Sequence, residues 1–127
     1  VLDACGGSGL LTFEAFSRGA EVTTVERNRS VAKLLADAAS ALGVTLDLRV
    51  DDARNALVSG EWDAVLLDPP YADDPVDWAA SAASSVRKVL VVEHASTAAM
   101  PDRIGQLEMD RERVYGDTKL SIYWRRP

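Results

Sequence analysis

Short apolar runs alternate with helical stretches along most of this chain, and no other feature limits the fold as strongly. Parallel strands need crossover connections that are usually helices, so the pattern predicts an α/β fold with a mostly parallel sheet. Strands are expected at Val1–Leu2, Glu21–Val25, Leu46–Val50, Ala64–Leu67 and Val89–Val92. Helices are expected at Leu11–Ser17, Val31–Leu42 and Asp77–Val86.

The helix expected over residues 31–42 has the clearest apolar spacing. Gly43 provides a C-terminal stop. The side chains that recur at helical spacing, and are expected on the buried face, are Val31, Leu34, Leu35, Ala38 and Leu42.

The C-terminal part of the chain has a different pattern. Glu108–Tyr115 and Lys119–Trp124 flank Gly116-Asp117, which is a turn signal. Two strands joined by a tight turn are antiparallel, so we expect the parallel sheet to finish in an antiparallel hairpin.

Length and composition set further bounds. The 127 residues suffice for a single domain with one core, and no apolar run is long enough for a membrane helix. Cys5, the only cysteine, excludes an internal disulfide and fits a reducing, cytoplasmic compartment; with His94 as the only histidine, no metal cluster is expected. The net charge of −6 argues against nucleic-acid binding, which usually draws on a basic surface. Because Val1-Leu2-Asp3 already has the pattern of a buried strand, we expect the natural protein to carry an N-terminal segment before this domain.

A glycine-rich loop, Asp3-Ala4-Cys5-Gly6-Gly7-Ser8-Gly9, follows the first strand and precedes a helix. Glycines let the backbone pass close to a ligand, and a helix N-terminus offers free N–H groups. The dinucleotide fingerprint fails, because Thr12 stands where its third glycine should be. Asp3 ahead of the glycines suits a ligand with an ammonium group; the alternative is a tight structural turn.

Carboxylates also follow the second and third strands. Glu26 is placed to accept the two hydroxyls of a ribose, and Asp52 to accept an adenine amino group while the N–H of Ala53 serves a ring nitrogen. Taken singly, Glu26 is equally well explained as a surface carboxylate, and Asp51-Asp52 is more often a solvated turn than a ligand site. Their successive positions at strand ends favour a ligand site, because open α/β sheets bind ligands at that edge.

Asp68-Pro69-Pro70-Tyr71 follows the fourth strand. Two prolines make a rigid segment that presents side chain and carbonyl in fixed directions. The Asp68 carboxylate and the Pro69 carbonyl are suited to hold both N–H groups of an exocyclic amine in line with a sulfonium methyl, and Tyr71 offers a face on which a base can stack. The alternative is a rigid structural turn.

These motifs together resemble the successive motifs of class I methyltransferases, and the D-P-P-Y tetrad resembles that of enzymes methylating exocyclic amines of bases. Three further segments resemble the bacterial 16S rRNA guanine-N2 methyltransferase family: Leu11–Ala20, Val92-Glu93-His94 and Tyr115–Tyr123.

The resemblance implies a Rossmann-like sheet of seven strands, six parallel and one antiparallel, and S-adenosyl-L-methionine as cofactor. The implied cofactor-binding residues are Asp3, Gly6, Gly7, Ser8, Gly9, Glu26, Asp52 and Ala53. The implied catalytic residues, which hold the target guanine, are Asp68, Pro69, Pro70 and Tyr71. The implied partner is ribosomal RNA or a small-subunit assembly intermediate, and we expect a monomer without a membrane partner.

Two other functions stay open. A DNA adenine-N6 methyltransferase shares the tetrad, although no stretch here is long enough for a target-recognition insertion. A non-catalytic S-adenosylmethionine-binding scaffold is the other alternative.

Single residues also have two possible roles. His94 is either a substrate contact or an ordinary strand-end residue, and Trp78 is either a packing residue or an RNA contact. The C-terminal arginines form either a phosphate patch or a solvated face: Arg111, Arg113, Arg125 and Arg126.

Overall fold

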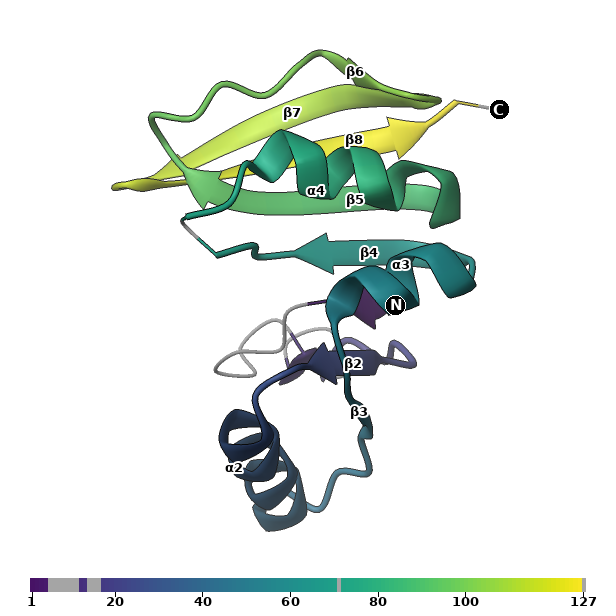
Figure 1. Cartoon of the computed structure of the whole chain (residues 1–127), viewed down its shortest axis with the longest axis vertical. Helices are drawn as coiled ribbons and strands as arrows, with labels where there is room; N and C mark the ends of the chain where they lie inside the picture. Colours follow the sequence, from purple (N-terminus) through teal and green to yellow (C-terminus); the bar gives the residue numbers. More distant parts are fainter. Residues whose placement is uncertain (5–11, 14–16, 71, 127) are drawn as a thin grey trace.

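The computed structural model describes residues 1–4, 12–13, 17–70 and 72–126. Their strands form one sheet of eight in the order β3-β2-β1-β4-β5-β8-β7-β6 (Figure 1). The strands are, in chain order, β1 (Leu2–Asp3), β2 (Thr23–Glu26), β3 (Asp47–Val50), β4 (Trp62–Leu67), β5 (Val86–Ala95), β6 (Arg103–Ile104), β7 (Leu107–Tyr115) and β8 (Thr118–Arg125).

The first five strands are mutually parallel, and β8 pairs antiparallel with both β5 and β7. This confirms the expected α/β class with an antiparallel C-terminal hairpin. The expected number of seven strands is wrong for the described residues, because Gly105, at φ 57, lets Arg103–Ile104 fold back and pair with Leu107 and Glu108 as an eighth strand. The strand order reverses between β1 and β4, where α/β sheets form a crevice at their carboxyl ends.

Three described helices connect the parallel strands: α2 (Arg29–Ala41), α3 (Ala53–Ser59) and α4 (Pro75–Ala82), the last followed by the short turn η1 (Ala83–Ser85). Each begins after a side-chain cap, provided in turn by Asn28, Asp52 and Asp74.

Two sequence expectations about the helices need correction. The expected helix over residues 77–86 begins earlier, because Asp74 caps it and Pro75 fits its first position, and it ends earlier, because Val86 already belongs to β5. Helix α3 was not expected. The helix expected at Leu11–Ser17 lies partly outside the described residues.

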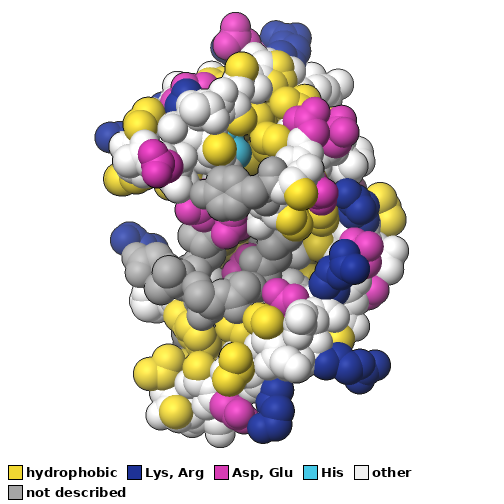
Figure 2. Space-filling model, turned by 60° about the vertical axis from the view of Figure 1, so that its left-hand side comes forward, with side chains coloured by type: hydrophobic (Ala, Val, Ile, Leu, Met, Phe, Trp, Pro, Cys, Tyr) yellow, Lys and Arg dark blue, Asp and Glu magenta, His cyan; other side chains and the backbone are white. Residues whose placement is uncertain are grey.

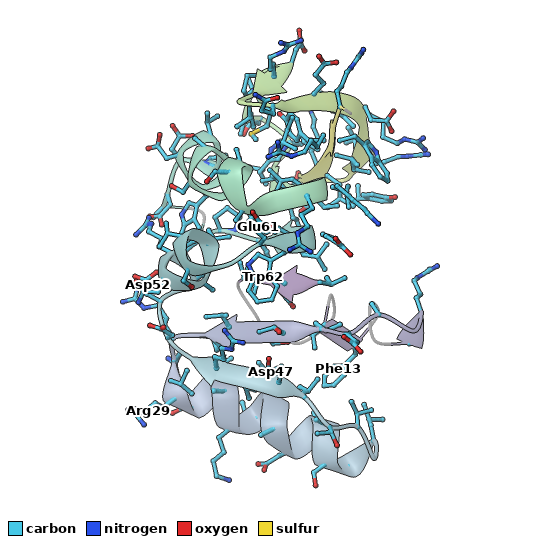
Figure 3. All side chains as sticks on the ribbon, turned by 90° about the vertical axis from the view of Figure 1, so that its right-hand side faces the viewer. Phe13, Arg29, Asp47, Asp52, Glu61 and Trp62 are labelled. Atoms are coloured by element: carbon cyan, nitrogen blue, oxygen red, sulfur yellow. The ribbon has the colours of Figure 1, made fainter. Side chains whose placement is uncertain are left out.

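The expected buried face of α2 is also wrong. Leu34 and Leu42 are 68% and 65% exposed, and the buried side chains are Ala32, Leu35 and Ala39. The small alanines let the helix lie close against β2 and β3, as Figure 3 shows at one end of the sheet. The buried face of α2 is therefore centred on Leu35 and rotated away from Leu34 and Leu42.

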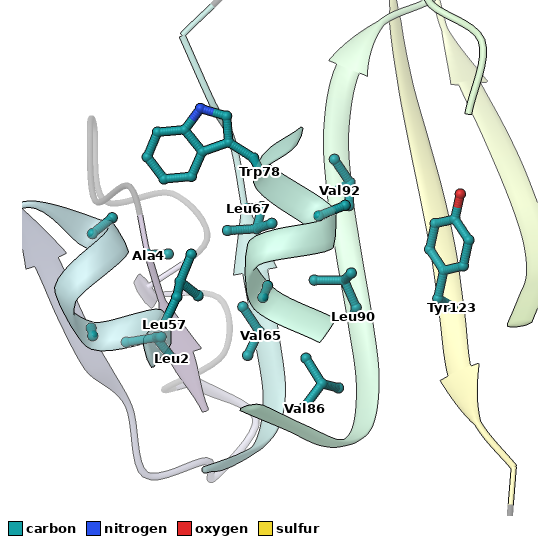
Figure 4. Close-up of a cluster of buried hydrophobic side chains, with 14 of the residues drawn as sticks. Leu2, Ala4, Leu57, Val65, Leu67, Trp78, Val86, Leu90, Val92 and Tyr123 are labelled. Atoms are coloured by element: carbon teal, nitrogen blue, oxygen red, sulfur yellow. The ribbon is translucent and has the colours of Figure 1, made fainter. Parts of the chain in front are cut away.

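The main core lies between the sheet and the helices α3 and α4 (Figure 4). It alternates along the strands: Leu90 and Val92 of β5 are buried against this layer, while Val89 and Val91 on the opposite face are partly exposed. Tyr123 of β8 extends the cluster, and its hydroxyl donates to the carbonyl of Pro101 at 2.6 Å. This packing fixes the ends of β4 and β5, where the candidate site lies.

Candidate functional site

The carboxyl ends of the parallel strands bring most of the described predicted residues to one edge of the sheet. A cavity of about 240 Å³, called here the larger cavity, is lined there by predicted residues from three loops: Glu26, Asp52, Ala53, Asp68 and Pro70. Figure 3 shows Asp52 at this edge, where β3 passes into α3. The sequence therefore placed these residues together, although their contacts to a ligand stay a prediction.

Glu26 is held at the rim of the larger cavity by the start of α2. Its Oε2 accepts the N–H of Asn28 at 2.8 Å, and Asn28 in turn caps α2 by accepting from Ser30 and Val31. The N–H of Asp51 donates to the carbonyl of Glu26 at 3.2 Å, which ties together the ends of β2 and β3. The carboxylate thus has a fixed place at the cavity.

Asp52 has two structural roles: it lines the larger cavity and it caps the N-terminus of α3. Its Oδ1 accepts the N–H of Arg54 at 2.9 Å, so the carboxylate and the first turn of α3 face the cavity together. Its own N–H donates to Oδ1 of Asp51 at 2.7 Å. The sequence reading as a ligand site and the reading as a turn are both compatible with this geometry.

Three residues of the larger cavity were not found from the sequence as a group. The Arg54 guanidinium lies 4.4 Å from the centroid of the Trp78 ring, and the Trp78 indole N–H donates to Oδ2 of Asp73 at 3.0 Å. Arg54 also lies 3.7 Å from the same Asp73 oxygen. Trp78 is buried, so its packing alternative is correct. The group joins α3 to α4, which is why no local sequence signal shows it.

Asp3 lies at the end of β1 but is not among the described residues that line the larger cavity; its neighbour Ala4 is. It is fully buried, and its Oδ2 accepts the Thr12 hydroxyl at 2.5 Å; that hydroxyl also lies 2.8 Å from the Thr24 hydroxyl. Asp3 therefore braces the two sides of the glycine-rich loop, and its contact to a ligand stays a prediction. The remaining predicted residues of that loop lie outside the described residues: Cys5, Gly6, Gly7, Ser8 and Gly9.

A smaller cavity, of about 70 Å³, lies on the other side of the Asp68–Pro70 segment and is lined by Asp68, Pro69 and Pro70 together with Glu93 and His94 of β5. Tyr71 lies outside the described residues. On the face shown in Figure 2, acidic side chains gather in the hollow of the molecule.

The two cavities share a wall. Asp68, Pro70 and Asp73 line both of them, and the N–H of Asp73 closes the turn by donating to the Pro70 carbonyl at 2.9 Å. Burial raises the pKa of Asp68. Burial, and then the neighbouring charge of Asp68, raise the pKa of Glu93. The two cavities are therefore adjacent, with the Asp68 carboxylate in the lining of both.

His94 uses both ring nitrogens inside the protein. Nδ1 lies 2.9 Å from the carbonyl of Ala95, which can only accept, so Nδ1 carries a proton. In the neutral ring, Nε2 then accepts from the Ser121 hydroxyl at 2.7 Å. The imidazole lines the smaller cavity and anchors the end of β5 to β8, which favours a positioning role over a substrate contact.

Most of the C-terminal arginines are compensated locally. Arg103 and Arg126 pair with Glu108, and Arg125 donates to the carbonyls of Val86 and Ala83. Arg111 pairs with its neighbour Asp110 at 2.8 Å. These contacts favour a structural role over a phosphate patch.

None of the helices in the described ranges is long and apolar enough to cross a membrane.

Comparison with known proteins shows the relatives of this chain. It is 29% identical over 138 residues to the Bacillus subtilis (strain 168) protein called "Putative rRNA methyltransferase YlbH", covering 98% of this chain and 75% of that protein. A solved structure of a conserved hypothetical protein from Streptococcus pyogenes is 30% identical, with a TM-score of 0.88 over 98% of this chain and 84% of that chain. The structure called "Putative methyltransferase yhhF from Escherichia coli" is 25% identical, with a TM-score of 0.83 over 98% and 74%.

The family model described as Conserved hypothetical protein 95 matches residues 1–124, which is nearly the whole chain. The match includes every loop at the carboxyl edge of the sheet and the C-terminal hairpin. The chain therefore belongs to the Conserved hypothetical protein 95 family.

Proposed function

We propose that this protein transfers a methyl group from S-adenosylmethionine to the exocyclic N2 amine of a guanine in 16S ribosomal RNA. The adjacency of the two cavities, which share lining residues, is the observation that carries the proposal. A methyl donor and its acceptor must lie a short distance apart for the transfer. The names of the B. subtilis and E. coli relatives support methyl transfer, and the former supports rRNA as the acceptor.

The polar groups around the larger cavity fit S-adenosylmethionine. Glu26 would accept from the ribose hydroxyls, Asp52 from the adenine amino group, and the N–H of Ala53 would donate to an adenine ring nitrogen. The glycine-rich loop after Asp3 would hold the methionine end. When bound, the cofactor supplies an electrophilic methyl group on a sulfonium sulfur.

The smaller cavity would receive the target guanine. The Asp68 carboxylate and the Pro69 carbonyl accept the two N–H groups of the amine, which holds the nitrogen toward the shared wall and favours its pyramidal form. S-adenosylmethionine in the larger cavity would supply the methyl group, and Asp68 would accept the amine proton that the methylated nitrogen loses and pass it to solvent. The raised pKa of Asp68 suits this transient proton transfer.

A guanine in a helix cannot reach this cavity, because its amine is paired and stacked. The substrate guanine is therefore single-stranded or turned out of its helix, in free ribosomal RNA or in a small-subunit assembly intermediate.

Transfer of tritiated methyl groups from S-adenosylmethionine to ribosomal RNA, to DNA and to a sample without nucleic acid tests the proposal. We expect radioactivity in the rRNA only. Radioactivity in the DNA would support an adenine-N6 methyltransferase instead, and none in either nucleic acid would support a non-catalytic scaffold.

A further inference from the structure

The geometry points to Glu93 as the residue that selects guanine, by accepting the N1–H that lies beside the amine held at Asp68. This inference rests on the proposed function and deepens it, because the shared wall accounts for an amine acceptor but not for the choice of base. Glu93 lines the smaller cavity with Asp68 and comes from a different strand.

The strand register places the two carboxylates side by side. Leu67, the last residue of β4, pairs with Val92 of β5, so Asp68 follows directly after β4 where Glu93 continues β5. Neighbouring strands lie about 4.8 Å apart, and both side chains line the smaller cavity. Burial, and second the charge of Asp68, raise the pKa of Glu93.

Glu93 is fixed in this place. It pairs with Leu120 of β8, and the next residue, His94, is anchored through both ring nitrogens. Within the described ranges, the ion pairs include neither Asp68 nor Glu93. Asp68 is exposed and Glu93 is partly buried, so the two carboxylates form an acceptor pair that donors on a ligand can reach.

Among the bases with an exocyclic amine, guanine alone offers an N–H on the ring nitrogen next to that amine. Adenine and cytosine present a lone pair at the corresponding nitrogen. With the amine at Asp68, such a lone pair would face the Glu93 carboxylate, which would be repelled and left without a donor. The pair Asp68–Glu93 therefore matches the N2–N1 edge of guanine and rejects the other two bases.

Three short synthetic RNAs test this inference, all with the sequence around the guanine that wild-type protein methylates in rRNA. They carry guanosine, 2-aminopurine riboside or 2,6-diaminopurine riboside at that position; both analogues keep the 2-amino group but have a lone pair at N1. For the wild type we expect kcat/KM to be roughly tenfold to a hundredfold lower on the analogues than on guanosine.

Glu93→Gln should reduce this preference at least about tenfold, because the amide can donate to the N1 lone pair of the analogues and no longer offers a charged acceptor to guanine. Glu61→Gln is the matched control. Glu61 lies just before β4, at the opposite end of that strand, where it pairs with Arg87 at 3.0 Å, so the preference should be unchanged. Binding of S-adenosylhomocysteine, measured by calorimetry, checks that both variants are folded.

Equal wild-type rates on guanosine and the analogues would overturn the inference without any variant, as would an unchanged preference in folded Glu93→Gln. Either result leaves the proposed function in place, because guanosine would still be methylated. Absence of guanosine methylation in rRNA would overturn the proposed function and this inference together.

Discussion

Replacement of Glu26 by alanine is the sharpest test of the larger cavity as the cofactor site. Glu26 would accept both ribose hydroxyls, and a hydrogen bond to a charged group contributes about 1.5–3 kcal/mol. The side chain is only half buried and already accepts the N–H of Asn28, so water competes for it and each of the two hydrogen bonds contributes less than that range. We expect a total loss of about 1–3 kcal/mol, which is a rise of roughly 5-fold to 150-fold in Kd.

Calorimetric titration with S-adenosylhomocysteine measures this loss. Glu26→Gln should lose less than Glu26→Ala, because it keeps an acceptor oxygen. Glu61→Ala removes the same charge at the opposite end of the sheet and should leave Kd unchanged. If Glu26→Ala binds as tightly as the wild type, Glu26 does not contact the ribose and the assignment of the larger cavity is wrong.

Three other substitutions test separate parts of the site. Asp68→Ala should reduce single-turnover methyl transfer by about a hundredfold or more with little change in RNA affinity, because its contact strengthens as the nitrogen rehybridises; an equal loss in binding would contradict this. Asp52→Ala should lower the free energy of unfolding by about 0.5–2 kcal/mol in urea denaturation through the lost cap, whereas Asp52→Asn should not; equal losses would show that the cap is not the cause. Glu93→Gln should raise Tm at neutral pH but not well below the ordinary Glu pKa of 4.5. The folded protein holds the Glu93 proton more tightly than the unfolded chain does, so the stability of the wild type falls as the pH rises from the ordinary Glu pKa through the raised pKa of Glu93. A variant Tm equal to that of the wild type at every pH would contradict this.

The positions of the parallel strands and the site edge were predictable because they follow from local patterns. Apolar runs locate β1 to β5, and the rule that ligands bind at the carboxyl ends of parallel strands brings Glu26, Asp52 and Asp68 together. The turn at Gly116 likewise predicts the β7–β8 hairpin. Each of these inferences needs only a short stretch of sequence.

Features that depend on contacts between distant segments were not predictable in this way. Helix α3 has only seven residues, too few for a clear apolar period, and its cap Asp52 has the pattern of a ligand residue as well. Packing against β2 and β3 selects Leu35 over Leu34, although both fit the helical spacing. Glu93 belongs to a segment that resembles the guanine-N2 methyltransferase family, but its proximity to Asp68 depends on the β4–β5 register.

Methyl transfer to the N2 amine of guanine is tested most directly with S-adenosylmethionine that carries a deuterated methyl group. The protein is incubated with 16S rRNA, and the nucleosides from the digested RNA are analysed by mass spectrometry. We expect the label in N2-methylguanosine, and its loss with Asp68→Ala. Label in N6-methyladenosine, or in no nucleoside, would contradict the proposed reaction.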